Sequence, residues 1–384
     1  MSDPIVHIVG AGPASLIAAI NLARARHEVI VHEQKSDVGL RFQGDFQGLE
    51  NWSTEEDVLD FLHSIGVSSE FRCEPYSMGS FYGPKGNPVT IKSSRPLFYL
   101  VERGKSRWSI DQDLKRQALE AGVKIQWNDK LKRVPPGKVI VGTGPKAADG
   151  MAKGIVFQTS YHDACLGFLD DRIAPKGYAY LLVNRGKATF ATCLFEDFKN
   201  GGIYFERALS TMRRVTNIVI ERPKRFSGFG NFSLQQPVIK GGNILYVGEN
   251  AGFQDALWGF GIRYAMLSGY LAAQSIMTGK SYDHLCHEKL RPMMETSLAN
   301  RWLFAHLGDL GYEKILKRLS KVDDIIPALR KHYKSSWFKR TIFPLAKRSY
   351  HSRLIDEQCM SEHCDCVWCK HCLHELERTC LDAG

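Results

Sequence analysis

The sequence has no stretch of about 18 uncharged apolar residues, the length that a membrane-spanning helix needs. It opens Met1-Ser2-Asp3-Pro4 without the basic segment of a secretory signal, and it has no internal repeat and no long low-complexity linker. These absences predict a globular protein in the cytoplasm. The 384 residues, 44% hydrophobic and 24% charged, suffice for two packed domains or one large α/β domain with an inserted layer.

The formal net charge of +10 is unevenly distributed. Residues 313–353 hold twelve Lys or Arg against three Asp or Glu, and Trp337, Phe338 and Leu345 lie among them. One interpretation is an amphipathic surface in peripheral contact with an anionic membrane; the other is an ordinary helical layer with a solvated basic face. No nucleic-acid-binding module accompanies the charge, so no nucleic-acid partner is predicted.

The first forty residues have the pattern of a strand–helix–strand unit. An apolar, β-branched run over 5–9 predicts a buried strand, residues 13–25 repeat with a helical period, and 29–32 predict the next strand, which closes at Glu33. Between the first strand and the helix lies Gly10-Ala11-Gly12-Pro13-Ala14-Ser15, which is G-x-G-x-x-S. This arrangement is typical of a dinucleotide-binding unit.

Each position in the motif has a physical role. Gly10 allows the tight turn, and Gly12 lets the backbone approach a pyrophosphate. The backbone amides of residues 13–15 open the helix and face that charge, while Ser15 stands where a small residue permits close helix–strand packing. Glu33 lies 23 residues after Gly10, where a carboxylate can accept the ribose hydroxyls of the adenosine half.

A second glycine-rich segment distinguishes FAD from NAD. Residues 248–253 (Gly-Glu-Asn-Ala-Gly-Phe) and 255–262 (Asp-Ala-Leu-Trp-Gly-Phe-Gly-Ile) match G-D-A-A-G…P…G-x-G-I without gaps. This segment resembles that of the flavoprotein superfamily that includes aromatic hydroxylases and geranylgeranyl reductases. The resemblance covers most of residues 1–280, and the most similar subgroup is that of the geranylgeranyl reductase-like FAD-dependent oxidoreductases.

The resemblance implies further cofactor contacts. Glu249 would meet the ribityl chain, and the turn that ends at Ile262 would present amides near the flavin ring. Arg103 and Arg41 match basic residues that the group has near the cofactor. Residues 142–144 (Gly-Thr-Gly) resemble the A-T-G or A-D-G turn of the group. The predicted FAD-binding residues are Gly10, Gly12, Pro13, Ala14, Ser15, Glu33, Arg41, Arg103, Gly144, Gly248, Glu249, Gly259, Gly261 and Ile262.

Three departures from the family pattern bear on function. Glu249 replaces the usual Asp, which should still bind. Ala256 replaces the usual Pro, which predicts a less rigid loop beside the flavin. Pro145 and Lys146 stand where hydroxylases that take NADPH have Asp-Gly and Arg, and this weakens a monooxygenase interpretation.

An aromatic segment is the candidate substrate wall. Residues 177–182 resemble the Tyr-x-Trp-x-Phe-Pro segment that lines the reductase cavity, with Tyr180 in place of Trp. An aromatic, apolar wall fits a long apolar substrate, although alternate aromatics can also simply pack a sheet. The candidate substrate residues are Tyr178, Tyr180, Phe253, Trp258 and Phe260. No nucleophile–base constellation stands out, and a flavin needs none; Tyr180 is the candidate proton donor.

Six cysteines crowd into the last 26 residues. They are Cys359, Cys364, Cys366, Cys369, Cys372 and Cys380, with His363, His371 and His374 among them. Thiolates at this spacing converge readily on one metal, and the predicted ligands are Cys364, Cys366, Cys369 and Cys372. The histidines favour zinc; a [4Fe–4S] cluster is the alternative, although the spacing is not that of a ferredoxin.

The sequence therefore predicts an α/β fold with a Rossmann-like FAD-binding domain (1–150 and 241–280). An antiparallel β substrate layer (151–240), a basic helical extension (281–355) and a Cys/His-rich tail (356–384) complete it. The leading function is a reductase that delivers hydride from reduced flavin to a C=C bond of an isoprenoid or lipid-like substrate. The alternatives are a monooxygenase or dehydrogenase of a small aromatic, and an electron-transfer protein with an iron–sulfur tail. The electron donor, NAD(P)H or a ferredoxin-like protein, stays open.

Overall fold

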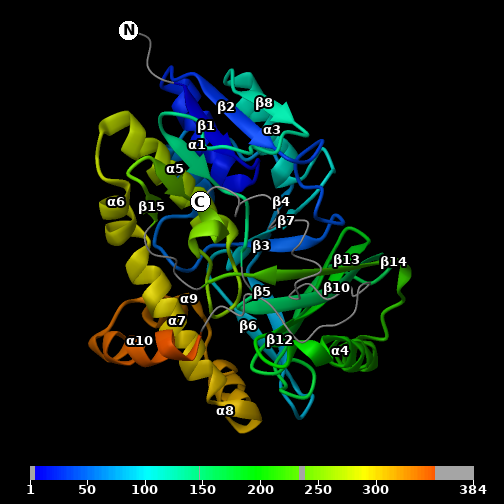
Figure 1. The fold of residues 1–384 in the computed structure, drawn as a ribbon. Coiled ribbons are helices and arrows are strands. Elements are labelled where there is room, and N and C mark those ends of the chain that lie inside the picture. The colour runs from blue at the N-terminus through cyan, green and yellow to red at the C-terminus, as the bar shows by residue number, and fades with distance from the viewer. Residues whose placement is uncertain (1–4, 147, 233–237, 351–384) are drawn as a thin grey trace.

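The fold is a mixed α/β arrangement, as predicted. It is seen in a computed structural model that describes residues 5–146, 148–232 and 238–350. Three sheets are present in these residues, and helices cover the first sheet and one side of the molecule (Figure 1).

The predicted strand–helix–strand unit lies at the centre of a six-stranded sheet with the order β15-β16-β9-β1-β2-β8. All neighbouring strands are parallel except β15 and β16. Parallel strands end at the same sheet edge, so the loops after β1, β2, β9 and β16 meet there. The strands are β1 (Val6–Val9), β2 (Val29–Glu33), β8 (Lys124–Trp127), β9 (Val139–Val141), β15 (Ile239–Lys240) and β16 (Ile244–Tyr246).

Three helices accompany this sheet: α1 (Pro13–Arg24), α3 (Ile110–Glu120) and α5 (Ile262–Thr278). The apolar periodicity of residues 110–121 and 262–277 predicts the last two of these helices, and the structure confirms both. α1 packs on α5 at very short range, because a Cβ at Gly269 would lie 2.0 Å from the backbone oxygen of Ala14. This contact joins the two glycine-rich segments, which are far apart in the chain, into one body.

A seven-stranded sheet forms the second layer, in the order β14-β10-β13-β12-β11-β5-β6. Its pairs are antiparallel except β5 with β11. Because β5 and β6 come from the N-terminal segment, the predicted boundary at residue 150 does not separate the sheets. The strands are β5 (Met78–Tyr82), β6 (Pro88–Lys92), β10 (Gly150–Gln158), β11 (Ala164–Phe168), β12 (Tyr178–Asn184), β13 (Lys187–Leu194) and β14 (Glu221–Gly230).

The rest of the second layer contains a helix that the sequence did not indicate. α4 (Gly201–Thr216), preceded by the short η1 (Phe198–Asn200), packs on this sheet through Phe205 and Met212. A small third sheet is formed by β3 (Phe46–Glu50), β7 (Phe98–Glu102) and β4 (Cys73–Tyr76).

The apolar residues of 51–66 recur with a helical period, which predicts a longer helix than the structure has. Only α2 (Val58–Ser64) is helical, and Asp57 caps it by accepting the N–H of Leu59. The preceding residues are held in turns by Glu50, whose carboxylate accepts the backbone N–H of Trp52. Side-chain hydrogen bonds therefore replace the first turns that periodicity alone predicts.

The C-terminal segment is helical, as predicted. The helices are α6 (Tyr282–Lys289), α7 (Arg291–Ala305), α8 (Gly308–Leu319), α9 (Ile326–Tyr333) and α10 (Trp337–Ser349). They run down one side of the molecule in yellow to orange, and α8 and α10 lie at its lower end (Figure 1). None of the helices in the described part of the chain is long and apolar enough to cross a membrane.

Candidate active site

A cavity of about 840 Å³ runs between the two large sheets and the C-terminal helices. One end is lined by the glycine loops after β1, β9 and β16, together with Glu33. The middle is lined by Tyr178, Tyr180 and Cys193 of the second sheet, and the far end by α8 and α9. The cavity therefore connects both predicted cofactor segments with an apolar region large enough for a second molecule.

The first glycine loop fits a pyrophosphate. Gly12 is the N-cap of α1, with no side-chain capping bond and no acidic residue in the first turn, so the opening amides are left for an anion. A Cβ at Gly12 would find no described protein atom nearer than 3.9 Å, and it would project into this cradle. At Gly10, by contrast, φ is +89° and a Cβ would lie 2.7 Å from the Gly142 carbonyl oxygen. The tight turn therefore requires glycine at position 10. At position 12, the absence of a side chain leaves the cradle open for a ligand.

Glu33 lines the same end and is already engaged by the backbone. One carboxylate oxygen accepts the N–H of Ala11 at 2.7 Å and the other that of Lys35 at 2.9 Å. These bonds tie the end of β2 to the glycine loop and aim the carboxylate along the cavity edge. Each oxygen keeps a lone pair for a ribose hydroxyl.

Ser15 lies behind the cradle and does not line the cavity. It is fully buried, and a Cβ at Gly142 would lie 2.3 Å from its hydroxyl oxygen. The Ser15 side chain therefore does not reach the cavity, and a cofactor contact through its backbone amide stays a prediction. Its role is the other one considered, which is close packing of α1 on the strand that leads into residues 142–144.

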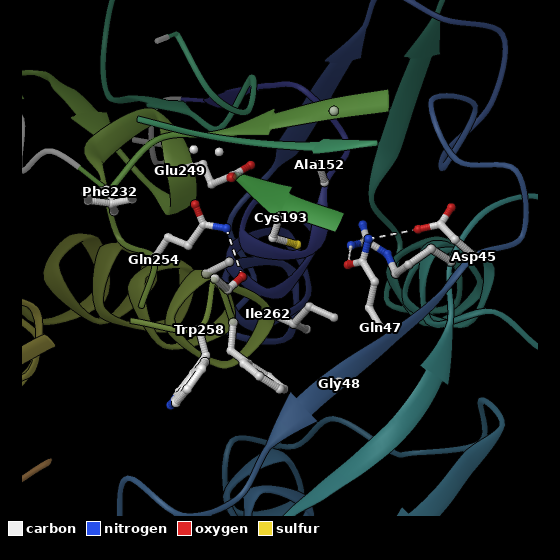
Figure 2. A pocket seen from close by; sticks show the side chains of 18 of the residues that line it. Asp45, Gln47, Gly48, Ala152, Cys193, Phe232, Glu249, Gln254, Trp258 and Ile262 are labelled. Atoms are coloured by element: carbon white, nitrogen blue, oxygen red, sulfur yellow. Dashed lines mark hydrogen bonds between the residues drawn. The ribbon is translucent and has the colours of Figure 1, made fainter. Parts of the chain in front are cut away.

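The second glycine segment brings opposite charges together. η2 (Gly248–Ala251) places Glu249 in the lining of the cavity (Figure 2). Burial raises the pKa of Glu249, and the nearby Arg41 and Arg103 oppose that rise. The site therefore holds a carboxylate and two guanidinium groups within one cavity.

The two arginines are positioned differently. Arg103 is buried and makes paired hydrogen bonds of 2.9 and 2.8 Å to Asp111, and a third of 2.9 Å to Gln47. Arg41 reaches Gly144, since a Cβ at that glycine would lie 3.3 Å from its guanidinium. Both line the cavity, as the resemblance implies.

The loop over 253–261 is held by a buried carboxylate. Asp255 accepts hydrogen bonds from Ser297 of α7, from Tyr333 of α9 and from the loop's own backbone at Trp258. The N–H of Ala256 donates to Ser297 at 2.6 Å, a bond that Pro cannot make. The expected loss of rigidity at Ala256 is therefore offset by hydrogen bonds to the C-terminal helices.

This clamp leads to a first prediction. Burial raises the pKa of Asp255 to about 6, so the acceptor carboxylate is the main form at neutral pH. Asp255→Asn places an amide N–H₂ among donors, and we expect a loss of about 1–3 kcal/mol in the free energy of unfolding. Urea unfolding measures this free energy, and the rate of flavin release reports whether the loop beside the cofactor has loosened. Ser297→Ala should act in the same direction, and unchanged stability and flavin release in both variants would refute the clamp.

The middle of the cavity contains four of the five predicted substrate residues. Tyr178, Tyr180, Trp258 and Phe260 line it, and Tyr178 donates to the Trp258 backbone oxygen. Burial raises the pKa of Tyr180 well above 10, so its hydroxyl stays protonated. Phe253 is the exception: it is 2% exposed, packs in the core of the first sheet and does not line the cavity. Its prediction as a wall residue is wrong.

Several lining residues were missed from the sequence. Asp45, Gln47 and Gln254 reach the cavity from loops and strand ends; Gln254 donates to the Gly259 oxygen (Figure 2). Cys193 faces the cavity from β13, where burial raises its pKa to about 12. None of these positions has a motif. The sequence also did not predict that α8 and α9 line the cavity, because the only pattern noted in that segment was its excess of Lys and Arg.

The predicted metal ligands Cys364, Cys366, Cys369 and Cys372 lie outside the described residues. Within residues 5–146, 148–232 and 238–350, no group of His, Cys, Asp and Glu is arranged to hold a metal ion.

Comparisons with known proteins agree with this geometry. Residues 8–48 match the model of the NAD(P)-binding Rossmann-like domain family. Over 365 residues the chain is 24% identical to a digeranylgeranylglycerophospholipid reductase of Methanococcus vannielii, covering 82% of this chain and 87% of the relative. A reductase of the same name from Haloferax volcanii is 23% identical and covers 83% and 90%.

Solved structures share the fold. A geranylgeranyl bacteriochlorophyll reductase-like protein of Thermoplasma acidophilum superposes with a TM-score of 0.67 at 16% identity, covering 91% of this chain and 97% of that one. The p-nitrophenol 4-monooxygenase of Pseudomonas putida superposes with a TM-score of 0.58 at 14% identity, covering 85% and 96%.

The fold and the double glycine cradle thus define a flavoprotein of the oxidoreductase class. Within that class the chain is similar to two digeranylgeranylglycerophospholipid reductases over more than four fifths of its length, which agrees with the resemblance predicted from residues 1–280.

Proposed function

We propose that this protein is an FAD-dependent reductase that adds hydride and a proton to a C=C bond of a long apolar, isoprenoid-like substrate. The observation that carries the proposal is the single cavity that joins two glycine cradles to an apolar far end. The reductase relatives, whose name specifies a lipid with two geranylgeranyl groups, support the substrate class.

The residues of the first sheet would hold the cofactor. The α1 N-terminus and Gly12 fit the pyrophosphate, Glu33 the ribose, and Glu249 with Arg41 and Arg103 the ribityl and phosphate region. Bound FAD in its reduced form would supply the hydride.

The residues of the second sheet and of the loop over 253–261 would hold the substrate. Tyr178, Trp258 and Phe260 form an aromatic wall that excludes water from the reacting carbon atoms. Tyr180 lies beside Tyr178 in the cavity lining, and this position makes it the proposed proton donor for the second carbon.

The direct test is product analysis. Protein with bound FAD, a chemical reductant and a geranylgeranyl lipid in detergent should yield lipid whose mass rises by two hydrogens for each reduced bond. A product that gains oxygen under air, with no reduced lipid, would favour the monooxygenase alternative suggested by the shared fold.

The tail supports a separate proposal, that Cys364, Cys366, Cys369 and Cys372 bind one zinc ion. We expect about one zinc per chain by elemental analysis, and no absorption beyond the flavin bands. The double change of Cys366 and Cys369 to Ser should remove the metal and leave FAD bound, because the cradles lie elsewhere.

The matched control for the tail is the double change of Cys73 and Cys286 to Ser, two cysteines in the first sheet's core region. It should keep the zinc. If the protein instead contains iron and absorbs broadly in the visible range, the tail holds an iron–sulfur cluster rather than zinc. That result would favour the electron-transfer alternative. Metal that survives in the tail variant would show that Cys366 and Cys369 are not ligands.

A further inference from the structure

Exposed apolar side chains gather on α8 and α10. Five of the twelve large hydrophobic side chains exposed in the described residues lie between 307 and 345, which is about a tenth of the chain. Leu310 and Trp337 are the most exposed of all twelve, at 78% and 77%. The five are Leu307, Leu310, Trp337, Phe338 and Leu345. A surface this apolar is unusual unless something binds it.

On α10 these side chains form one stripe. Trp337 and Phe338 open the helix and Leu345 follows two turns later, so they share its outer face. Ile342 and Ala346 are buried on the adjacent side of the helix, and α10 packs on α7. The outer face is therefore left without a partner in the described structure.

Basic side chains surround the stripe. Between 306 and 350 there are eleven Lys or Arg against four Asp or Glu. The exposed ones form no ion pair with described residues; on α8 and α10 they are Lys314, Lys317, Arg318, Arg340, Lys347 and Arg348. Exposed Trp, Phe and Leu within a basic rim are the combination that inserts into the interface of an anionic bilayer.

The cavity lining reaches the exposed start of α8. Leu307 is 39% exposed and also lines the cavity, and Leu316 and Leu319 of α8 continue the lining inwards with Leu329 of α9. An apolar path therefore leads from the exposed end of α8 to the aromatic wall of the second sheet.

We infer that α8 and α10 form a docking surface for an anionic lipid bilayer, through which a lipid substrate enters the cavity from the membrane. The inference rests on the proposed function for the identity of the substrate, but not for the binding itself. A bilayer supplies both requirements of the surface, negative charge at the rim and an apolar interior for the stripe.

The acidic residues beyond 355 are the rival occupant, since seven Asp or Glu stand there against two Lys or Arg. A shielded surface would leave the full-length chain in solution. The test therefore uses the full-length holoprotein and compares vesicles of phosphatidylcholine alone with vesicles that also contain phosphatidylglycerol.

We expect sedimentation with the anionic vesicles only, and weaker binding as salt rises. Changing Trp337 and Phe338 together to Ser, or Arg340, Lys347 and Arg348 together to Gln, should each lower the partition coefficient at least about tenfold. The matched controls lie on and after α4: Ile203 with Val219 to Ser, and Arg207, Arg213 and Arg214 to Gln. These controls should bind as the parent does.

The docking inference and the proposed function fail differently. A parent that stays in solution, or controls that lose as much binding as the test variants, would overturn the docking surface. Reduction of a detergent-solubilised lipid would still proceed in that case. If docking is correct, the Trp337 and Phe338 variant keeps its rate on solubilised lipid and loses it on lipid embedded in anionic vesicles.

Discussion

Gly12→Val is expected to give folded protein that no longer retains FAD. The nearest described protein atom to a Cβ at this position is 3.9 Å away, and Gly12 has φ −82°, so the protein itself tolerates a side chain there. The new methyl groups would instead fill the cradle at the N-terminus of α1, where the pyrophosphate must approach the backbone. Gel filtration followed by the visible spectrum measures the effect, and we expect near-complete loss of the flavin bands.

The control distinguishes this effect from misfolding. Gly202→Val lies in α4, away from the cavity, and a Cβ there meets nothing within 4 Å. It should remain yellow. Gly10→Val should fail to fold, because its Cβ would collide with the Gly142 carbonyl oxygen. Yellow, folded Gly12→Val would refute the assignment of the cradle.

A second large effect is expected at the far end of the cavity. Ala328 lines the cavity from α9 and is only half-buried, so Ala328→Trp should fold and shorten the space available to a chain. We expect the rate on a 20-carbon isoprenoid chain to fall at least about tenfold, with a much smaller change on a 10-carbon chain. FAD content and the flavin spectrum should not change, because the cradles lie at the other end.

Met277→Trp is the matched control for Ala328→Trp, since it adds the same ring at the end of α5, outside the cavity lining. It should leave both rates unchanged. Equal losses on the long and the short substrate in Ala328→Trp would show that the far end does not hold the chain.

The residues that the sequence predicts to bind the cofactor all line one cavity, except Ser15. Their motifs are local, because Gly12 and Glu33 need fixed backbone positions within one strand–helix–strand unit. Sequence alone did not place Ser15 behind the cradle or Phe253 in the core. Both lie within a motif, but each side chain points away from the cavity, and only packing decides that direction.

The substrate half was predicted less completely. The contribution of α8 and α9 to the cavity depends on long-range packing, and no local pattern marks Leu316 or Leu329 as cavity residues. The clamp at Asp255 is a similar case, since its partners Ser297 and Tyr333 are far from it in sequence. The charge of the C-terminal segment was visible in the sequence, whereas the exposed stripe on α10 was defined only by the fold.

The most direct test of the reductase function is reoxidation of the flavin without oxygen. Holoprotein is photoreduced under anaerobic conditions and mixed with a geranylgeranyl lipid in detergent, and the return of the oxidised flavin absorbance is followed. The proposal predicts that the lipid alone restores the oxidised spectrum, with one flavin reoxidised for each double bond reduced. A flavin that stays reduced until air is admitted, with the lipid unchanged, would contradict it.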